Sequence, residues 1–215
     1  MQQISDKMAG LYVHIPFCKS RCIYCAFYST TSAGMEEKYV SALCRELDLR
    51  SDYCSSEWQT VYIGGGTPST LSQEQLQRLF SHIDCSHAKE VTIECNPDDI
   101  TPSFASLLAS LPVNRVSMGA QTFDDSRLGF LRRRHNAAEV VNAVSTLRDA
   151  GIDNISIDLI YGFPGESLKQ WDDDITAALS LGVEHLSAYC LSYEEGTPLY
   201  RMLEEGKVEE SDDEL

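Results

Sequence analysis

Three cysteines near the N-terminus have a spacing that suits an iron-sulfur cluster. Cys18, Cys22 and Cys25 form a C-x3-C-x2-C run directly after a short apolar segment with strand character. Three thiolates on one short loop can hold three irons of a four-iron cubane and leave the fourth iron open. Clusters that only carry electrons are normally closed by four cysteines. The run therefore predicts a site where a ligand binds to the cluster and reacts.

Other uses of these cysteines stay open from spacing alone. A structural zinc site takes four ligands, usually in paired spacings, and no second C-x2-C pair is present. A disulfide framework is disfavoured, because 8 cysteines in 215 residues are not dense and the chain opens without an apolar signal segment. We therefore expect a reducing, cytoplasmic location. The remaining cysteines are predicted to be buried small hydrophobic residues, namely Cys44, Cys54, Cys85, Cys95 and Cys190.

Composition describes an ordinary globular protein, with 43% hydrophobic and 23% charged residues. The formal net charge of -16 argues against a nucleic-acid partner, which would require a basic stripe. The run Arg132–Arg134 is the nearest approach to a basic patch, and we interpret it as a solvated or phosphate-tolerant turn rather than a nucleic-acid surface. No apolar run is long enough to span a bilayer.

Short β-rich runs alternate with longer helical patterns along the chain. Such alternation indicates α/β architecture with right-handed βαβ units and a parallel sheet, either doubly wound or curled into a barrel. The predicted strands are 11–14, 60–64, 90–95, 115–119, 154–159 and 186–191. The predicted helices are 35–50, 72–83, 102–109, 137–150 and 168–181.

Candidate functional residues follow the predicted strands, as expected when sites form at the carboxyl ends of parallel strands. The cysteine run follows the first strand, and Gly64-Gly65-Gly66-Thr67-Pro68 follows the second. The glycines let the backbone approach a ligand, for example an amino-acid head group. A tight strand-to-helix turn is the alternative explanation, and the spacing is not that of a P-loop.

Two acids and an amide complete the predicted mouth of the sheet. Glu94 and Asp158 lie on otherwise apolar strands, where a carboxylate costs free energy unless it has a partner or a ligand. Salt bridges to Arg115 or Arg133 are the structural alternative. Gln121 either contacts a ligand or fixes a loop.

These motifs together resemble the radical S-adenosylmethionine (SAM) superfamily, in the branch that contains oxygen-independent coproporphyrinogen III oxidases and HemW-type heme chaperones. The resemblance covers nearly the whole chain, and the fold it implies is a partial (β/α)6 TIM-like barrel. It rests on the cysteine run, the Gly-Gly-Gly-Thr-Pro turn and the segments 12–17, 117–121 and 158–165.

The resemblance implies that Cys18, Cys22 and Cys25 bind a [4Fe-4S] cluster whose open iron is chelated by the amino and carboxylate groups of SAM. One electron from the cluster would cleave SAM and yield a 5'-deoxyadenosyl radical that abstracts hydrogen from a substrate. By position in the family motifs, the residues implied to contact SAM are Tyr12, Tyr24, Gly65, Gly66, Thr67, Glu94, Gln121, Arg133 and Asp158.

Within this branch, the loop after the third cysteine favours the heme chaperones. The oxidases carry a further cysteine two positions after the third ligand, whereas this chain has Ala26 and Phe27 there. The chaperones usually have aspartate where Ala26 stands, which is a departure from their pattern. A chaperone would bind heme and pass it to an acceptor protein. An oxidase, a radical SAM oxidoreductase, would act on the propionate side chains of a porphyrinogen. A third alternative is a noncatalytic remnant that binds only the cluster.

The resemblance also implies an electron donor and the boundaries of the domain. A flavodoxin- or ferredoxin-type protein would be the electron donor. We expect residues 1–203 to form the barrel and residues 204–215 an acidic tail, at a truncation point before the family's C-terminal region. His135-Asn136 begins like the His-Asn-x-x-Tyr-Trp heme motif of the chaperones but lacks its Tyr-Trp, and we interpret it as a helix start.

Overall fold

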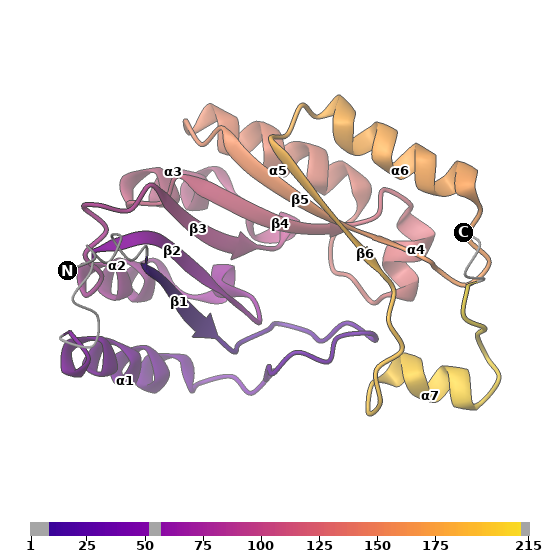
Figure 1. Cartoon of the computed structure of the whole chain (residues 1–215), viewed down its shortest axis with the longest axis horizontal. Helices are drawn as coiled ribbons and strands as arrows, with labels where there is room; N and C mark the ends of the chain where they lie inside the picture. Colours follow the sequence, from indigo (N-terminus) through magenta and orange to yellow (C-terminus); the bar gives the residue numbers. More distant parts are fainter. Residues whose placement is uncertain (1–8, 52–56, 212–215) are drawn as a thin grey trace, which may run out of the picture.

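The fold is a single parallel sheet whose six strands follow one another in chain order. The computed structural model describes residues 9–51 and 57–211. A doubly wound sheet would reverse its strand order at a switch point, so the sequential order identifies the barrel alternative, with β1 and β6 as its two edges. Figure 1 shows the strands as one fan. The strands are β1 (Ala9–Ile15), β2 (Trp58–Gly65), β3 (Glu90–Cys95), β4 (Arg115–Gln121), β5 (Asn154–Tyr161) and β6 (His185–Cys190).

The helices begin at residues that satisfy the free backbone N–H groups of a first turn. Ser72, Asn136 and Ser167 each form a capping box, and Asn136 confirms the predicted helix start. The helices are α1 (Glu36–Leu49), α2 (Gln73–Ser81), α3 (Pro102–Ser110), α4 (Asp125–Phe130), α5 (Ala137–Asp149), α6 (Leu168–Ser180) and α7 (Pro198–Glu204), with short 3-10 turns η1 (Pro68–Thr70) and η2 (Pro97–Asp99).

Side chains alternate along the strands, so the two faces of the sheet differ in polarity. One face packs on the helices through a main core that includes Ile63, Ile93 and Ile157, each fully buried. The other face lines the lumen and is largely polar, whereas the lumen of a complete TIM barrel is filled by layers of branched apolar side chains. The lumen face therefore presents hydrogen-bonding groups where a complete barrel has a packed apolar core. The polar residues on this face include Tyr12, His14, Tyr62, Thr92, Glu94, Arg115, Ser117, Asp158 and Ser187.

A second, smaller core lies under the loop that carries the three cysteines. Ile23 is buried in it together with Leu131, Phe163 and Leu199, the last from α7. The backbone of Ile23 also forms hydrogen bonds with two residues of this cluster. Its N–H donates to the carbonyl of Leu131 (3.2 Å), and its carbonyl accepts from the N–H of Leu199 (3.0 Å). Figure 1 shows the loop after β1 reaching across toward α7.

The structure confirms every predicted strand and helix that lies in the described residues, to within a few residues at the ends. It adds α4 and α7, which we did not predict. Among the described residues, no helix is long and apolar enough to cross a bilayer. The boundary at residue 203 stays a prediction, next to the last residue of α7.

The prediction for the five single cysteines is only partly correct. Cys44 and Cys95 are buried, Cys85 is half-buried, and Cys54 lies outside the described residues. Cys190 is exposed, which is a correction. It ends the edge strand β6, most of whose residues are exposed, so no neighbouring element covers it.

Candidate functional site

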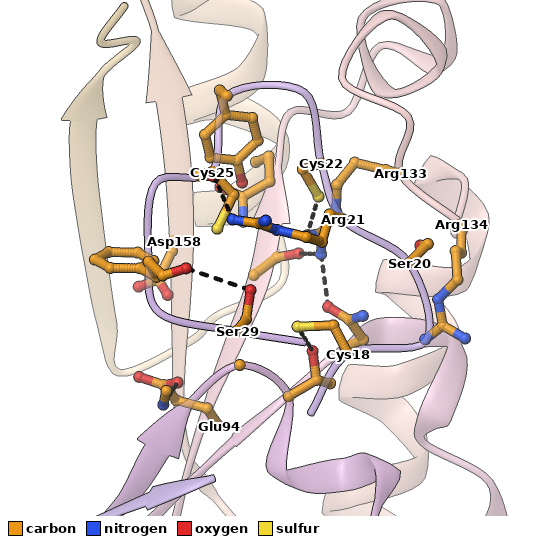
Figure 2. A pocket seen from close by; sticks show the side chains of 18 of the residues that line it. Cys18, Ser20, Arg21, Cys22, Cys25, Ser29, Glu94, Arg133, Arg134 and Asp158 are labelled. Atoms are coloured by element: carbon orange, nitrogen blue, oxygen red, sulfur yellow. Dashed lines mark hydrogen bonds between the residues drawn. The ribbon is translucent and has the colours of Figure 1, made fainter. Parts of the chain in front are cut away.

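The three cysteines of the motif face one cavity at the carboxyl end of the sheet. Cys18, Cys22 and Cys25 all line a cavity of about 160 Å³, and Figure 2 shows their side chains around it. A second cavity of about 540 Å³ shares Cys25 with the first and extends over the lumen toward β6. Residues that line both are Tyr24, Cys25, Phe27, Glu94, Ser117, Gln121 and Asp158.

The glycine turn after β2 packs directly against the cysteine loop. The N–H of Gly66 donates to the carbonyl of Ile15 (2.7 Å), and the N–H of Thr67 donates to that of Phe17 (2.7 Å). A Cβ on Gly66 would lie 2.7 Å from the Phe17 oxygen and 3.0 Å from Cys18 Sγ. The absence of a side chain is therefore required by the protein's own packing. Thr67 Oγ1 also donates to Cys18 Sγ at 3.6 Å.

The guanidinium group of Arg133 contacts the sulfur of Cys22. Its Nη1 donates to Cys22 Sγ at 3.4 Å, while Nη2 donates to Asn96 Oδ1 (2.8 Å) and to the carbonyl of Gly119 (2.6 Å). The turn that aims it ends α4 with Arg132 at φ 59°, a left-handed conformation that is rare outside glycine. The prediction of a solvated arginine turn is thus wrong for Arg133. It is also wrong for Arg134, which is half-buried and paired with acids.

Two carboxylates of the lumen are half-buried. Glu94 accepts hydrogen bonds from Tyr62 Oη (2.7 Å) and from the N–H of Gly65 (2.9 Å). Burial nevertheless raises the pKa of Glu94, and it raises that of Asp158 too. Ser117 Oγ contacts Asp158 only at 3.5 Å. Each carboxylate thus keeps hydrogen-bonding capacity directed at a cavity, where a polar ligand would use it.

The salt bridges considered from the sequence are not formed. Among the described residues, neither Glu94 nor Asp158 has an ion-pair partner. Arg115 lines the larger cavity and donates a long hydrogen bond of 3.4 Å to Thr92.

Gln121 lies at the end of β4 in a strained conformation. Its φ of 72° is left-handed, and the pairing of β4 with β5 shifts register between Gly119 and Gln121. Such bulges re-aim side chains and cluster at functional sites. Gln121 is buried and lines both cavities, and its contact with a ligand stays a prediction.

The two tyrosines of the predicted set lie in different settings. Tyr24 lines both cavities, and burial raises its pKa strongly. Tyr12 lines neither cavity. Its ring stacks on Tyr62, with centroids 6.0 Å apart, and its hydroxyl contacts His14 Nδ1 at 3.0 Å. Tyr12 is therefore one side chain removed from the larger cavity, which Tyr62 lines.

The donor set suits an iron-sulfur cluster. Three thiols of one loop face one cavity, and Thr67 and Arg133 supply hydrogen bonds to two of the sulfurs, which is how proteins stabilise and tune clusters. Burial and the neighbouring thiols of Cys22 and Cys18 raise the pKa of Cys25. Within the described residues, no three His, Cys, Asp or Glu side chains are grouped as ligands of a single metal ion.

Sequence reasoning missed several residues that line the site. Asn96 positions Arg133, and Ser117 and Ser187 line the larger cavity on the lumen face. Two signals could have found them. Asn96 directly follows β3, and each serine pairs in register with a predicted acid on the neighbouring strand, Ser117 with Glu94 and Ser187 with Asp158.

Comparison with known proteins assigns the family. Residues 12–178 match the family model of the radical SAM superfamily, and the chain belongs to that superfamily. Membership implies a [4Fe-4S] cluster and SAM as cofactors. In structure, the chain is similar to coproporphyrinogen III oxidase (HemN) from Escherichia coli, with a TM-score of 0.83 over 97% of this chain and 50% of that chain, at 24% identity. That likeness confirms the fold.

Among curated proteins, the chain is similar in sequence to heme chaperones. It is 38% identical over 209 residues to the heme chaperone HemW of Bacillus subtilis, covering 94% of this chain and 55% of that protein. It is 36% identical over 215 residues to HemW of Mycobacterium tuberculosis, covering 96% of this chain and 55% of that protein. The chain thus spans about half the length of the curated relatives it matches.

Proposed function

We propose that this chain is the cluster-binding barrel of a HemW-type heme chaperone. The observation that carries the proposal is that three thiols of one loop face a cavity that Glu94 and Gln121 also line. The 38% identity to the Bacillus subtilis chaperone supports the choice within the superfamily. The Cys25-Ala26-Phe27 continuation, without a fourth cysteine, supports it as well.

In this proposal the protein's residues hold and orient the cofactors. Cys18, Cys22 and Cys25 ligate three irons, and the lumen carboxylates Glu94 and Asp158 accept hydrogen bonds from SAM. The remaining proposed contacts are Tyr12, Tyr24, Gly65, Gly66, Thr67, Gln121 and Arg133. When both cofactors are bound, the reduced cluster supplies the electron for reductive cleavage of SAM. The protein contributes binding, orientation and exclusion of water.

Heme is the proposed cargo, an acceptor protein the proposed recipient, and a flavodoxin- or ferredoxin-type protein the proposed electron donor. These proposals rest on what the names of the relatives say, because those relatives extend well beyond the matched half. The second candidate is a coproporphyrinogen III oxidase. The larger cavity of about 540 Å³ favours this candidate because it places Glu94, Asp158 and Arg115 among apolar side chains beside Cys25. A cluster-binding remnant without cofactor chemistry is the third.

The test is anaerobic reconstitution with iron and sulfide, followed by EPR of the reduced protein with and without SAM. The proposal expects a cubane signal that changes on addition of SAM and is lost in Cys22→Ala, with Cys44→Ala as a control at a buried cysteine outside the site. Heme titration by absorbance then separates the chaperone from the oxidase. A cluster that ignores SAM would leave only the remnant, and the absence of a cluster would refute all three.

A further inference from the structure

One buried acid outside both cavities holds the mouth of the barrel together. Asp99 ends the 3-10 turn η2 after β3, and its side chain is 2% exposed. Oδ1 accepts from Lys19 Nζ at 2.6 Å and from Arg134 Nη2 at 3.2 Å, while Oδ2 accepts from Ser69 Oγ at 2.7 Å. Two cations and a hydroxyl satisfy this buried carboxylate.

Each partner of Asp99 comes from a different loop of the site. Lys19 stands between Cys18 and Cys22 in the cysteine loop, and Ser69 follows the glycine turn. Arg134 is adjacent to Arg133, whose guanidinium contacts Cys22 Sγ. Asp99 therefore joins the segments that follow β1, β2 and β4 to its own turn after β3.

The segment between the first two cysteines depends on this contact. Cys18 is fixed by its N–H to the carbonyl of Thr30 (2.9 Å), and Ile23 is fixed in the smaller core. Between them, within the described chain, residues 19–21 make no backbone hydrogen bond, and Arg21 reaches only the carbonyl of Cys25, inside the same loop. In the part of the chain that the structure describes, the Lys19–Asp99 bridge is thus the one polar contact between residues 19–21 and the rest of the barrel.

We propose that Asp99 is a positioning residue for the cluster. By holding Lys19 and Arg134 it sets the placement of Cys18 relative to Cys22 and the approach of Arg133 to the Cys22 sulfur. The affinity for the cluster and its reduction potential depend on this placement and on this approach, because residues that hydrogen-bond to the ligands orient them and tune the bound metal centre. The inference rests on the cluster site of the proposed function, and it concerns a residue that touches neither cluster nor SAM.

The test compares Asp99→Asn with Asp98→Asn. Asp98 pairs with Arg134 at 2.9 Å but forms no hydrogen bond or ion pair with Lys19 or Ser69, so it provides the same charge change without the loop contact. We expect Asp99→Asn to bind the cluster about tenfold more weakly and to shift its reduction potential and EPR spectrum. Asp98→Asn also removes one acid from Arg134 but leaves the Lys19 contact, so it should change the affinity and the potential less than Asp99→Asn does. Asp99→Glu should recover part of the loss.

A second readout needs no cluster. In the anaerobic metal-free protein, labelling of Cys18 and Cys22 by a maleimide, followed by peptide mass spectrometry, should be several-fold faster in Asp99→Asn than in Asp98→Asn. If Asp99→Asn does not fold, Lys19→Met cuts the same tie from the loop, where the lysine side chain is 52% exposed, and should give the same acceleration.

Equal labelling rates and equal potentials in all variants would overturn the inference. A wild-type protein that forms no cluster would refute the proposed function instead, and the labelling rates of the metal-free protein would still decide the role of Asp99.

Discussion

His135 makes the stability of this protein sensitive to mild acid. It is 4% exposed, and its Nε2 lies 3.0 Å from the carbonyl of Ala120. A carbonyl only accepts, so Nε2 carries the proton of the neutral ring. Its Nδ1 is buried and has no hydrogen-bond partner among the residues that the structure describes. Burial, together with the nearby Arg133 guanidinium, lowers the pKa of His135 from 6.5 to about 4.

The size of the effect follows from linkage. Between pH 6.5 and 4 the unfolded chain binds a proton that the folded state refuses, so stability falls as the pH falls. At 1.36 kcal/mol for each pKa unit, the loss at pH 4 is about 3 kcal/mol. His135→Gln removes this titration, and His135→Phe removes it while keeping a ring in the space.

The assay is urea unfolding of the metal-free, reduced protein at pH 4 to 7, followed by tryptophan fluorescence and circular dichroism. Carboxyl groups titrate in the same range, and their contributions cancel in the comparison between variants. The free energy of unfolding of the wild type, relative to either variant, should drop by about 3 kcal/mol from pH 7 to pH 4. Parallel pH profiles for wild type and both variants would refute the assignment of a neutral, buried His135.

Three further predictions follow from other contacts. Arg127→Met removes the ion-pair partner of two buried carboxylates, Glu166 and Asp174. It should lower the free energy of unfolding, measured by urea titration, by about 3–5 kcal/mol. A loss below about 1 kcal/mol would contradict this. Because burial raises the pKa of Glu94, the wild type should lose stability relative to Glu94→Gln as the pH rises above 4.5, the reverse of the His135 effect, and flat difference curves would disprove this. Gly66→Ala forces a Cβ to within 2.7 Å of the Phe17 oxygen and should at least halve the iron content after reconstitution, whereas Gly129→Ala, which meets nothing within 4 Å on α4, should be neutral or stabilising by up to about 1 kcal/mol.

Much of the fold was predictable from the sequence because its signals are local. Strand and helix patterns, caps and the rule that sites follow strands place the three cysteines, Glu94 and Gln121 at one mouth. The short helix α4 contains Gly129 and spans only six residues, too few for a clear period. The start of α7 carried a signal in Thr197-Pro198, a cap followed by a first-turn proline, that we did not use.

The features that could not be predicted are contacts between residues that are far apart in the sequence. No local pattern shows that Asp99 bonds Lys19, Ser69 and Arg134, because these positions are joined only by the closing of the sheet. The placement of Arg133 is similar, since its neighbours in sequence are polar and its partners lie in the cysteine loop, after β3 and on β4.

The contact of Ile23 with Leu199 has a consequence for how the protein is made. During synthesis the chain emerges from its N-terminus, so the three thiols are produced long before α7 exists to complete the small core beneath them. Throughout that interval the cysteine loop lacks one of its two backbone anchors at Ile23. We therefore expect the cysteine loop to reach its final shape only after α7 has been made.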